Sequence, residues 1–243
     1  MKDFKFNEKL GNADYNQSIV VFLDILGFKN KIQSGDFKDV KLILEYMEAW
    51  NTLDGVNMFI EEKDFVNETY VKRNSVDFGR IQKELQISYF SDSLVITLPY
   101  IETNFNERLF LIVRSLAYLQ SKLAMSNFFS RGGITIGDMF HKKNLFFGPA
   151  YLQAYELEQI ATYPRIILSS EIEKKYDQNM PYLKKAGDNL VYVDFLRFAS
   201  EISNSSVSIE LIVQNIDSNI NKFADNLKVM SKYAWLKSML DKY

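Results

Sequence analysis

The hydrophobic and polar positions of the chain follow two different periods. Short apolar runs rich in β-branched residues, bounded by Gly, Ser or Asp, predict strands at 18–28, 84–100, 131–140, 165–169 and 190–196. Longer stretches with helical apolar spacing predict helices at 39–50, 106–129, 149–161, 171–178 and 207–242. This order favours one α+β domain with helices packed on a mainly antiparallel sheet.

Two turns are expected between strands. Ser91, Asp92 and Ser93 are turn formers in the middle of 84–100, so this run predicts a hairpin. A second hairpin is expected at 141–148, where His-Lys-Lys-Asn forms the turn and Leu-Phe-Phe-Gly the returning strand. Residues 55–83 carry scattered charges and give only a weak prediction.

The composition excludes several classes of protein. The 243 residues are 47% hydrophobic with a net charge of −2, which gives no reason to expect a nucleic-acid or membrane partner. The absence of cysteine excludes disulfides, zinc ribbons and thiol catalysis. The first 18 residues lack the apolar segment of a signal peptide, and no apolar run approaches the roughly 20 residues of a membrane span. We therefore expect a cytoplasmic protein.

Two acids stand at strand boundaries. Asp24 lies inside an otherwise apolar run, where an unpaired carboxylate is costly, so it indicates function more than structure. Asp92 alone suits a hairpin turn, but the two carboxylates converge if the first strand neighbours the hairpin. Close carboxylates need a cation or a proton, and magnesium typically uses one or two of them with substrate phosphates. The residues thus predict a nucleotide site with one or two ions, about 3.5–4 Å apart if two bind.

Simpler explanations hold for other candidates. His141, the only histidine, is expected in a solvated turn beside Lys142 and Lys143. Phe146 and Phe147 are more typical of a core than of a surface that stacks on a nucleobase.

Four motifs, in order, resemble the class III nucleotidyl cyclases. They are Val-Phe-Leu-Asp-Ile-Leu-Gly-Phe, Phe-Ser-Asp-Ser-Leu-Val-Ile, Arg-Gly-Gly-Ile-Thr-Ile-Gly and Phe-Phe-Gly-Pro-Ala-Tyr-Leu-Gln-Ala-Tyr-Glu-Leu-Glu, within about residues 18–170. The family's first strand and hairpin each supply a metal-binding Asp, which implies this role for Asp24 and Asp92. The third motif begins at Arg131, and Gly148 precedes a helix as in the family.

The resemblance implies a ferredoxin-like, or palm, sheet with helices on one face, followed by C-terminal helices. It divides the chain into an N-terminal extension at 1–17, a catalytic domain at 18–200 and a helical segment at 201–243 that packs on the domain or in a dimer. The first strand is also similar to that of the diguanylate cyclases, but Phe-Ser-Asp-Ser is not their GGDEF signature.

Within the class, the motifs RGGI, FGPA, AYELE and YPRI look most like the pyrimidine cyclases of bacterial Pycsar anti-phage systems. This implies conversion of UTP, in preference to CTP, to the 3′,5′-cyclic monophosphate and pyrophosphate. The product would be a second messenger for a separate effector. Two Mg²⁺ or Mn²⁺ ions would be held by Asp24, Asp92 and the backbone carbonyl of Ile25.

Three positions depart from the purine cyclases. Ser88 stands where those enzymes have a base-selecting Lys, as expected if the nucleobase has changed. Leu152 and Glu156 stand where they have the Asn and Arg that stabilise the transition state, and Glu cannot neutralise phosphate. Either another cation does this or the site is inactive, and the retention of both metal-binding acids favours the first. The candidate cations are Arg131, Lys142, Lys143 and Arg165.

The remaining roles also follow from the resemblance. Arg131 would assist catalysis, and the backbone amides of Leu26, Gly27 and Phe28 would hold the β- and γ-phosphates. The candidates for the nucleobase pocket are Ser88, Tyr89 and Phe146. Each site of the family lies between two subunits, so we expect a homodimer. The alternatives are an adenylate or guanylate cyclase, and a non-catalytic nucleotide-binding regulator on the same fold.

Overall fold

The computed structural model describes five ranges of the chain, namely 14–35, 37–51, 80–81, 83–202 and 207–240. The weakly predicted stretch 55–83 therefore lies almost entirely outside the described residues, as do the first 13 residues of the expected N-terminal extension.

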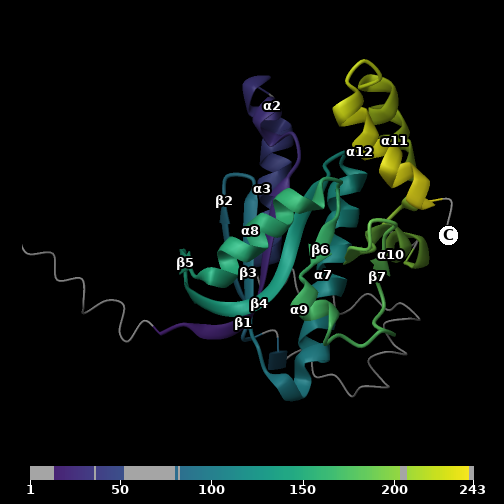
Figure 1. Ribbon diagram of the computed structural model, residues 1–243. Helices are drawn as coiled ribbons and strands as arrows, with labels where there is room; N and C mark the ends of the chain where they lie inside the picture. The colour runs from purple at the N-terminus through teal and green to yellow at the C-terminus, as the bar shows by residue number, and fades with distance from the viewer. Residues whose placement is uncertain (1–13, 36, 52–79, 82, 203–206, 241–243) are drawn as a thin grey trace, which may run out of the picture.

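One sheet forms the centre of the molecule (Figure 1). Its strands follow the order β2-β3-β1-β4-β6-β8-β7, and β5 pairs with β4 as the expected second hairpin. The strands are β1 (Asn16–Ile25), β2 (Gln86–Phe90), β3 (Ser93–Pro99), β4 (Ser130–Lys142), β5 (Leu145–Phe147), β6 (Ile166–Leu168), β7 (Leu183–Lys185) and β8 (Val191–Val193). The order β2-β3-β1-β4, all antiparallel, is that of a ferredoxin-like βαββαβ unit. The predicted α+β class and palm-like sheet are therefore confirmed.

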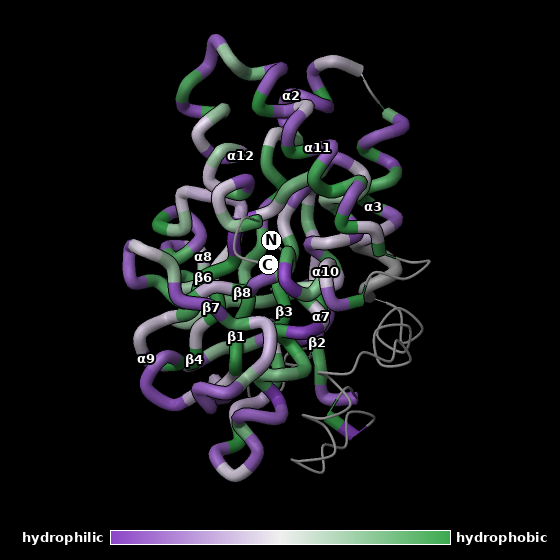
Figure 2. Tube along the Cα trace, turned by 90° about the vertical axis from the view of Figure 1, so that its right-hand side faces the viewer, coloured by the Kyte–Doolittle hydropathy of each residue, from purple (hydrophilic) through white to green (hydrophobic). Residues whose placement is uncertain are grey.

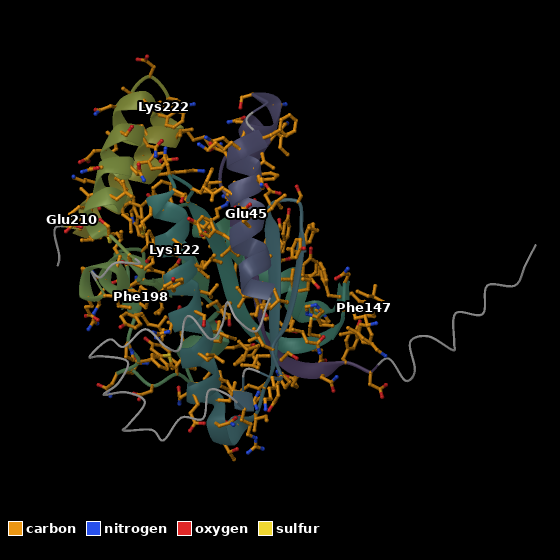
Figure 3. All side chains as sticks on the ribbon, turned by 180° about the vertical axis from the view of Figure 1, so that it is seen from behind. Glu45, Lys122, Phe147, Phe198, Glu210 and Lys222 are labelled. Carbon is orange, nitrogen blue, oxygen red and sulfur yellow. The ribbon has the colours of Figure 1, made fainter. Side chains whose placement is uncertain are left out.

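The helices cover both faces of this sheet. They are α2 (Phe28–Gln33), α3 (Phe37–Asn51), α7 (Phe105–Met125), α8 (Pro149–Ala161), α9 (Ser170–Glu173), α10 (Phe195–Glu201), α11 (Ile209–Lys222) and α12 (Leu227–Leu240), with a 3₁₀ turn at Glu102–Asn104. Figure 3 shows α3 and α7, marked by Glu45 and Lys122, on the same side of the sheet. The predicted layer of helices on one face holds for these two, whereas α8 packs on the opposite face against β1 and β4.

Burial on both faces explains the unbroken apolar run of β1. Ile19, Val21 and Leu23 point into the main core with α7, and Val20 and Phe22 point into a smaller core with α8. In Figure 2 the hydrophobic segments run through these central strands, and hydrophilic segments lie mainly at the periphery.

A glycine allows α8 to approach the sheet closely. A Cβ atom at Gly133 of β4 would overlap the Leu157 side chain and the Ala154 carbonyl of α8. The Arg-Gly-Gly-Ile motif therefore fixes the distance between the strand and the helix at this point.

The C-terminal helices belong to the same packed unit. Ile212 and Ile216 of α11 and Leu236 of α12 are buried in the main core. Asn215 donates hydrogen bonds of 2.9 Å to the carbonyls of Ala124 and Met125, at the C-terminal end of α7. Within the described part of the chain, no helix combines the length and apolarity that a membrane span requires.

Candidate active site

The two predicted acids meet at one end of the sheet. Asp24 lies opposite Ser93 of β3 and Arg131 of β4 in the strand register. Asp92 lies in the two-residue turn between β2 and β3, directly before Ser93. Its carbonyl accepts a hydrogen bond of 3.1 Å from the Ile25 amide. The backbone thus holds the hairpin tip against the end of β1, as the sequence predicts.

The surroundings of Asp24 disfavour its ionised form. Burial, followed by the charges of Asp92 and Glu158, raises the pKa of Asp24 from 3.8 to about 7. Arg131 and a hydrogen bond of 3.4 Å from Ser93 Oγ act in the opposite direction without cancelling this effect. Near neutral pH the site therefore favours either a proton on Asp24 or a cation beside it.

Arg131 is held by an acid that the sequence analysis did not single out. Glu158 of α8 forms an ion pair with the Arg131 guanidinium, and its side chain is only 1% exposed. Burial raises the pKa of Glu158, and Arg131 counteracts this. A signal was present, since Glu158 lies one helical turn after the buried Ala154, on the face of α8 toward the sheet. The pair orients Arg131 beside Asp24.

The turn after β1 has one amide fewer for phosphate than predicted. Gly27 adopts the left-handed conformation, with φ 81°, and precedes α2. The Leu26 amide donates to the Phe129 carbonyl at 2.8 Å, so this N–H is already used within the chain. Gly27 and Phe28 stay candidates, because the first N–H groups of a helix have no partner within it.

The predicted nucleobase residues divide between the two faces of β2. Ser88 of β2 pairs with Val95, which lies two residues after Ser93, the partner of Asp24. Ser88 therefore points to the same face as Asp24, and Tyr89 points to the other. Ser88 is bonded to His141 Nε2 at 2.8 Å and donates to the Lys143 carbonyl at 2.7 Å. Phe146 packs edge-on against His141, so Ser88 and Phe146 are neighbours and Tyr89 lies apart.

His141 is not a solvated turn residue, contrary to the prediction. It lies in β4 with Nδ1 2.8 Å from Thr97 Oγ1 and Nε2 bonded to Ser88. Burial lowers the pKa of His141, which keeps the ring neutral at pH 7. The turn is limited to Lys143 and Asn144, and the missed signal was the set of polar positions that face it from β2 and β3.

The candidate cations differ in their access to the acids. Arg165 is buried, donates to the Ala161 carbonyl at 3.0 Å and is paired with Asp188, so its role is structural. Lys142 and Lys143 lie at the far end of β4 from Arg131. Figure 3 places Phe147, beside this turn, on the opposite side of the molecule from Lys222 of α11. Only Arg131, among these four, lies at Asp24 within one chain.

The acids fit a hard divalent cation. Within the described residues no group of three or more His, Cys, Asp or Glu side chains converges for a metal. Asp24 and Asp92 are nevertheless a donor set of the kind magnesium uses, since it commonly takes one or two carboxylates and completes its shell with water and phosphate. Burial, followed by the charges of Asp92 and Glu158, raises the pKa of Asp24, so a cation bound there would stabilise its ionised form.

Comparisons with known proteins give likenesses to solved structures, including the following two. No family model and no curated protein matches the chain. The fold is similar to an adenylate/guanylate cyclase/hydrolase from Silicibacter pomeroyi, with 14% identity and a TM-score of 0.41 over 74% of this chain and 95% of that one. It is also similar to a bacterial light-regulated adenylyl cyclase, with 13% identity and a TM-score of 0.42 over 83% of this chain and 56% of that one. Scores below 0.5 establish neither family nor activity.

Proposed function

We propose that this protein is a metal-dependent nucleotidyl cyclase that converts UTP, in preference to CTP, to the 3′,5′-cyclic monophosphate and pyrophosphate. The observation that carries the proposal is the meeting of Asp24 and Asp92 at one end of a ferredoxin-like sheet, with the pKa of Asp24 raised to about 7. Such a pair binds a divalent cation above that pH, and a bound cation attracts a triphosphate.

Asp24, Asp92 and the Ile25 carbonyl would hold two Mg²⁺ or Mn²⁺ ions. When bound, these ions would make the ribose 3′-hydroxyl more acidic and offset the charge on the triphosphate. The 3′-oxygen bonds to the α-phosphorus as the bond to pyrophosphate breaks, and the hydroxyl proton passes to solvent. Arg131, oriented by Glu158, binds a phosphate oxygen beside Asp24. The amides of Gly27 and Phe28 orient the terminal phosphates.

The choice of a pyrimidine rests on the neutral network around Ser88. Hydroxyl and imidazole groups of Ser88, Thr97 and His141 replace a charged base-selecting side chain on this part of the sheet. Phe146, packed beside His141, supplies an aromatic surface next to them. We place the nucleobase against this network, with Tyr89 outside it.

The active form is proposed to be a homodimer with sites at the interface. On the α8 face Leu152 is 59% and Phe90 43% exposed. A second copy would cover this apolar surface and bring its own nucleobase network to the acids. The cyclic product would act on a separate effector in anti-phage defence.

A turnover assay tests the proposal. The protein is incubated with ATP, GTP, CTP or UTP and with Mg²⁺ or Mn²⁺, and products are identified by mass. We expect one cyclic pyrimidine product, with turnover lower by about a thousandfold or more in Asp24→Asn and Asp92→Asn. Asp138→Asn, an exposed acid at the other end of β4, is the matched control and should keep wild-type turnover.

Each other result of this assay has a definite meaning. A cyclic purine product would retain the chemistry and remove the pyrimidine assignment. Nucleotide binding without pyrophosphate release would favour the non-catalytic regulator, for which Glu156 in place of an Arg is the supporting observation. Unchanged turnover in Asp24→Asn would overturn the proposed site.

A further inference from the structure

The C-terminal helix α12 docks on the end of the sheet that carries the acids. Tyr233 packs edge-on against Phe129, with ring centroids 5.2 Å apart. Phe129 directly precedes β4, and its carbonyl accepts the Leu26 amide at the end of β1. Tyr233 therefore contacts Phe129, which lies two residues before Arg131. The hydrogen-bonded partner of Phe129, Leu26, lies two residues after Asp24.

A second contact fixes the orientation of α12. Trp235 stacks on Tyr163 with ring centroids 4.9 Å apart and an interplanar angle of 6°, and the Arg165 guanidinium lies 5.1 Å from the Trp235 ring centroid. Tyr163 and Arg165 belong to the Tyr-Pro-Arg-Ile motif, for which the proposed chemistry has no use. These residues of the motif contact α12 and orient it beside the site.

This docking places Lys232 among the charged groups of the site. Lys232 precedes Tyr233 and is partly buried, and it interacts favourably with the carboxylates of Glu158 and Asp24. Arg131 and Lys228, the residue one turn earlier in α12, repel it. Burial and this repulsion lower the pKa of Lys232.

The charges of this cluster are arranged for an additional anion. Lys228 and Lys232 form a like-charge i, i+4 pair, and Lys228 lies in the first turn of α12, where the helix dipole disfavours a cation. Glu158 is already paired with Arg131. Once divalent ions occupy Asp24 and Asp92, these carboxylates no longer balance the charge of Lys232, and a multiply charged anion can do so.

We propose that Lys232 of α12, assisted by Lys228, binds the phosphate chain of the substrate at the Asp24 end of the sheet. This proposal rests on the proposed function for its substrate, because only there does the site receive a triphosphate. It supplies within one chain the positive charge that Glu156 does not provide, and it makes the C-terminal helices part of the site rather than an appendage.

Binding of inorganic tripolyphosphate tests this without a nucleotide. Calorimetry is done with the full chain in excess Mg²⁺, for wild type, Lys232→Met, Lys232→Arg and Lys228→Met. We expect Lys232→Met to weaken binding about tenfold, Lys228→Met about threefold, and Lys232→Arg to restore most of the affinity. Lys237→Met is the matched control, because Lys237 is on the same helix and pairs with Asp217 at 2.8 Å instead.

Circular dichroism and thermal melting establish that each variant is folded. Wild-type affinity in Lys232→Met would overturn the proposal, and so would an equal loss in Lys237→Met or a loss that Lys232→Arg does not restore. Failure of the proposed function has a different signature: tripolyphosphate binding that depends on Lys232, with no cyclic product from any nucleotide. Normal turnover and unchanged binding in Lys232→Met would leave the cyclase in place and remove only the role of Lys232.

Discussion

The two ends of the α8 face show how burial acts on a titratable group with and without partners. At one end, burial and like charges raise the pKa of Asp24 to about 7. At the other, burial lowers the pKa of His141, but Thr97 and Ser88 occupy both ring nitrogens. Burial favours the neutral form in both cases. Both ring nitrogens of His141 have partners within the chain, whereas Asp24 near neutral pH takes up a proton or a cation. This difference favours the aspartate end as the place of the chemistry.

The largest expected effect comes from breaking the ion pair at the charged end. Glu158→Gln leaves the Arg131 guanidinium next to an amide and should reduce the free energy of unfolding by about 3 kcal/mol. Urea denaturation measures this. The matched control is Glu201→Gln, which removes the partly exposed pair with Arg197 and should cost under about 0.5 kcal/mol. An equal loss of unfolding free energy in the two variants would mean that burial does not increase the contribution of the Arg131–Glu158 pair.

A pH series sharpens the comparison at Asp24. Its pKa in the folded protein, about 7, lies above the ordinary value of 3.8, so the folded state binds more protons than the unfolded state between these values. The wild-type free energy of unfolding should therefore contain a contribution that falls as the pH rises from about 4 to 7. Asp24→Asn removes it and should be more stable than wild type at pH 8 by about 1–2 kcal/mol, after a discount for solvent screening.

The same series separates this cause from a general effect of the substitution. At pH 4 the difference between Asp24→Asn and wild type should vanish, and Mg²⁺ at pH 8 should stabilise wild type but not the variant. Thermal or chemical denaturation at the two pH values gives the comparison. A stability difference that is independent of pH would refute the raised pKa.

The smallest effect is expected at the neutral end. Ser88→Ala leaves His141 Nε2 with only the Lys143 carbonyl, 3.1 Å away, and should cost about 1 kcal/mol. The cost should be the same at pH 7 and pH 8, because burial lowers the pKa of His141 from its ordinary value of 6.5. The control Ser200→Ala removes a partly buried helix-terminal hydroxyl that donates to the Arg197 carbonyl, and should cost less. A strong pH dependence of Ser88→Ala would contradict a neutral histidine.

The sequence predicts what depends on local signals and misses what depends on distant partners. The acid within the apolar run of β1 and the Ser-Asp-Ser turn are local, so the meeting of Asp24 and Asp92 follows once the two elements are neighbours. The environment of His141 depends on Ser88 and Thr97, more than 40 positions away. Lys232 reaches the site only because Trp235 docks on Tyr163, and no pattern within 207–242 indicates that contact.

The location of β1 has a consequence for how the protein exchanges its amide hydrogens. β1 is bonded to β3 on one side and β4 on the other, and helices cover both its faces. The amides around Asp24 are therefore expected to exchange only when the whole fold opens, whereas α12 can detach locally with far less buried surface. The proposed site thus combines slowly exchanging amides, around Asp24, with faster exchanging amides, in α12. Local opening of α12 is therefore expected to remove Lys228 and Lys232 from the site while Asp24 stays in place.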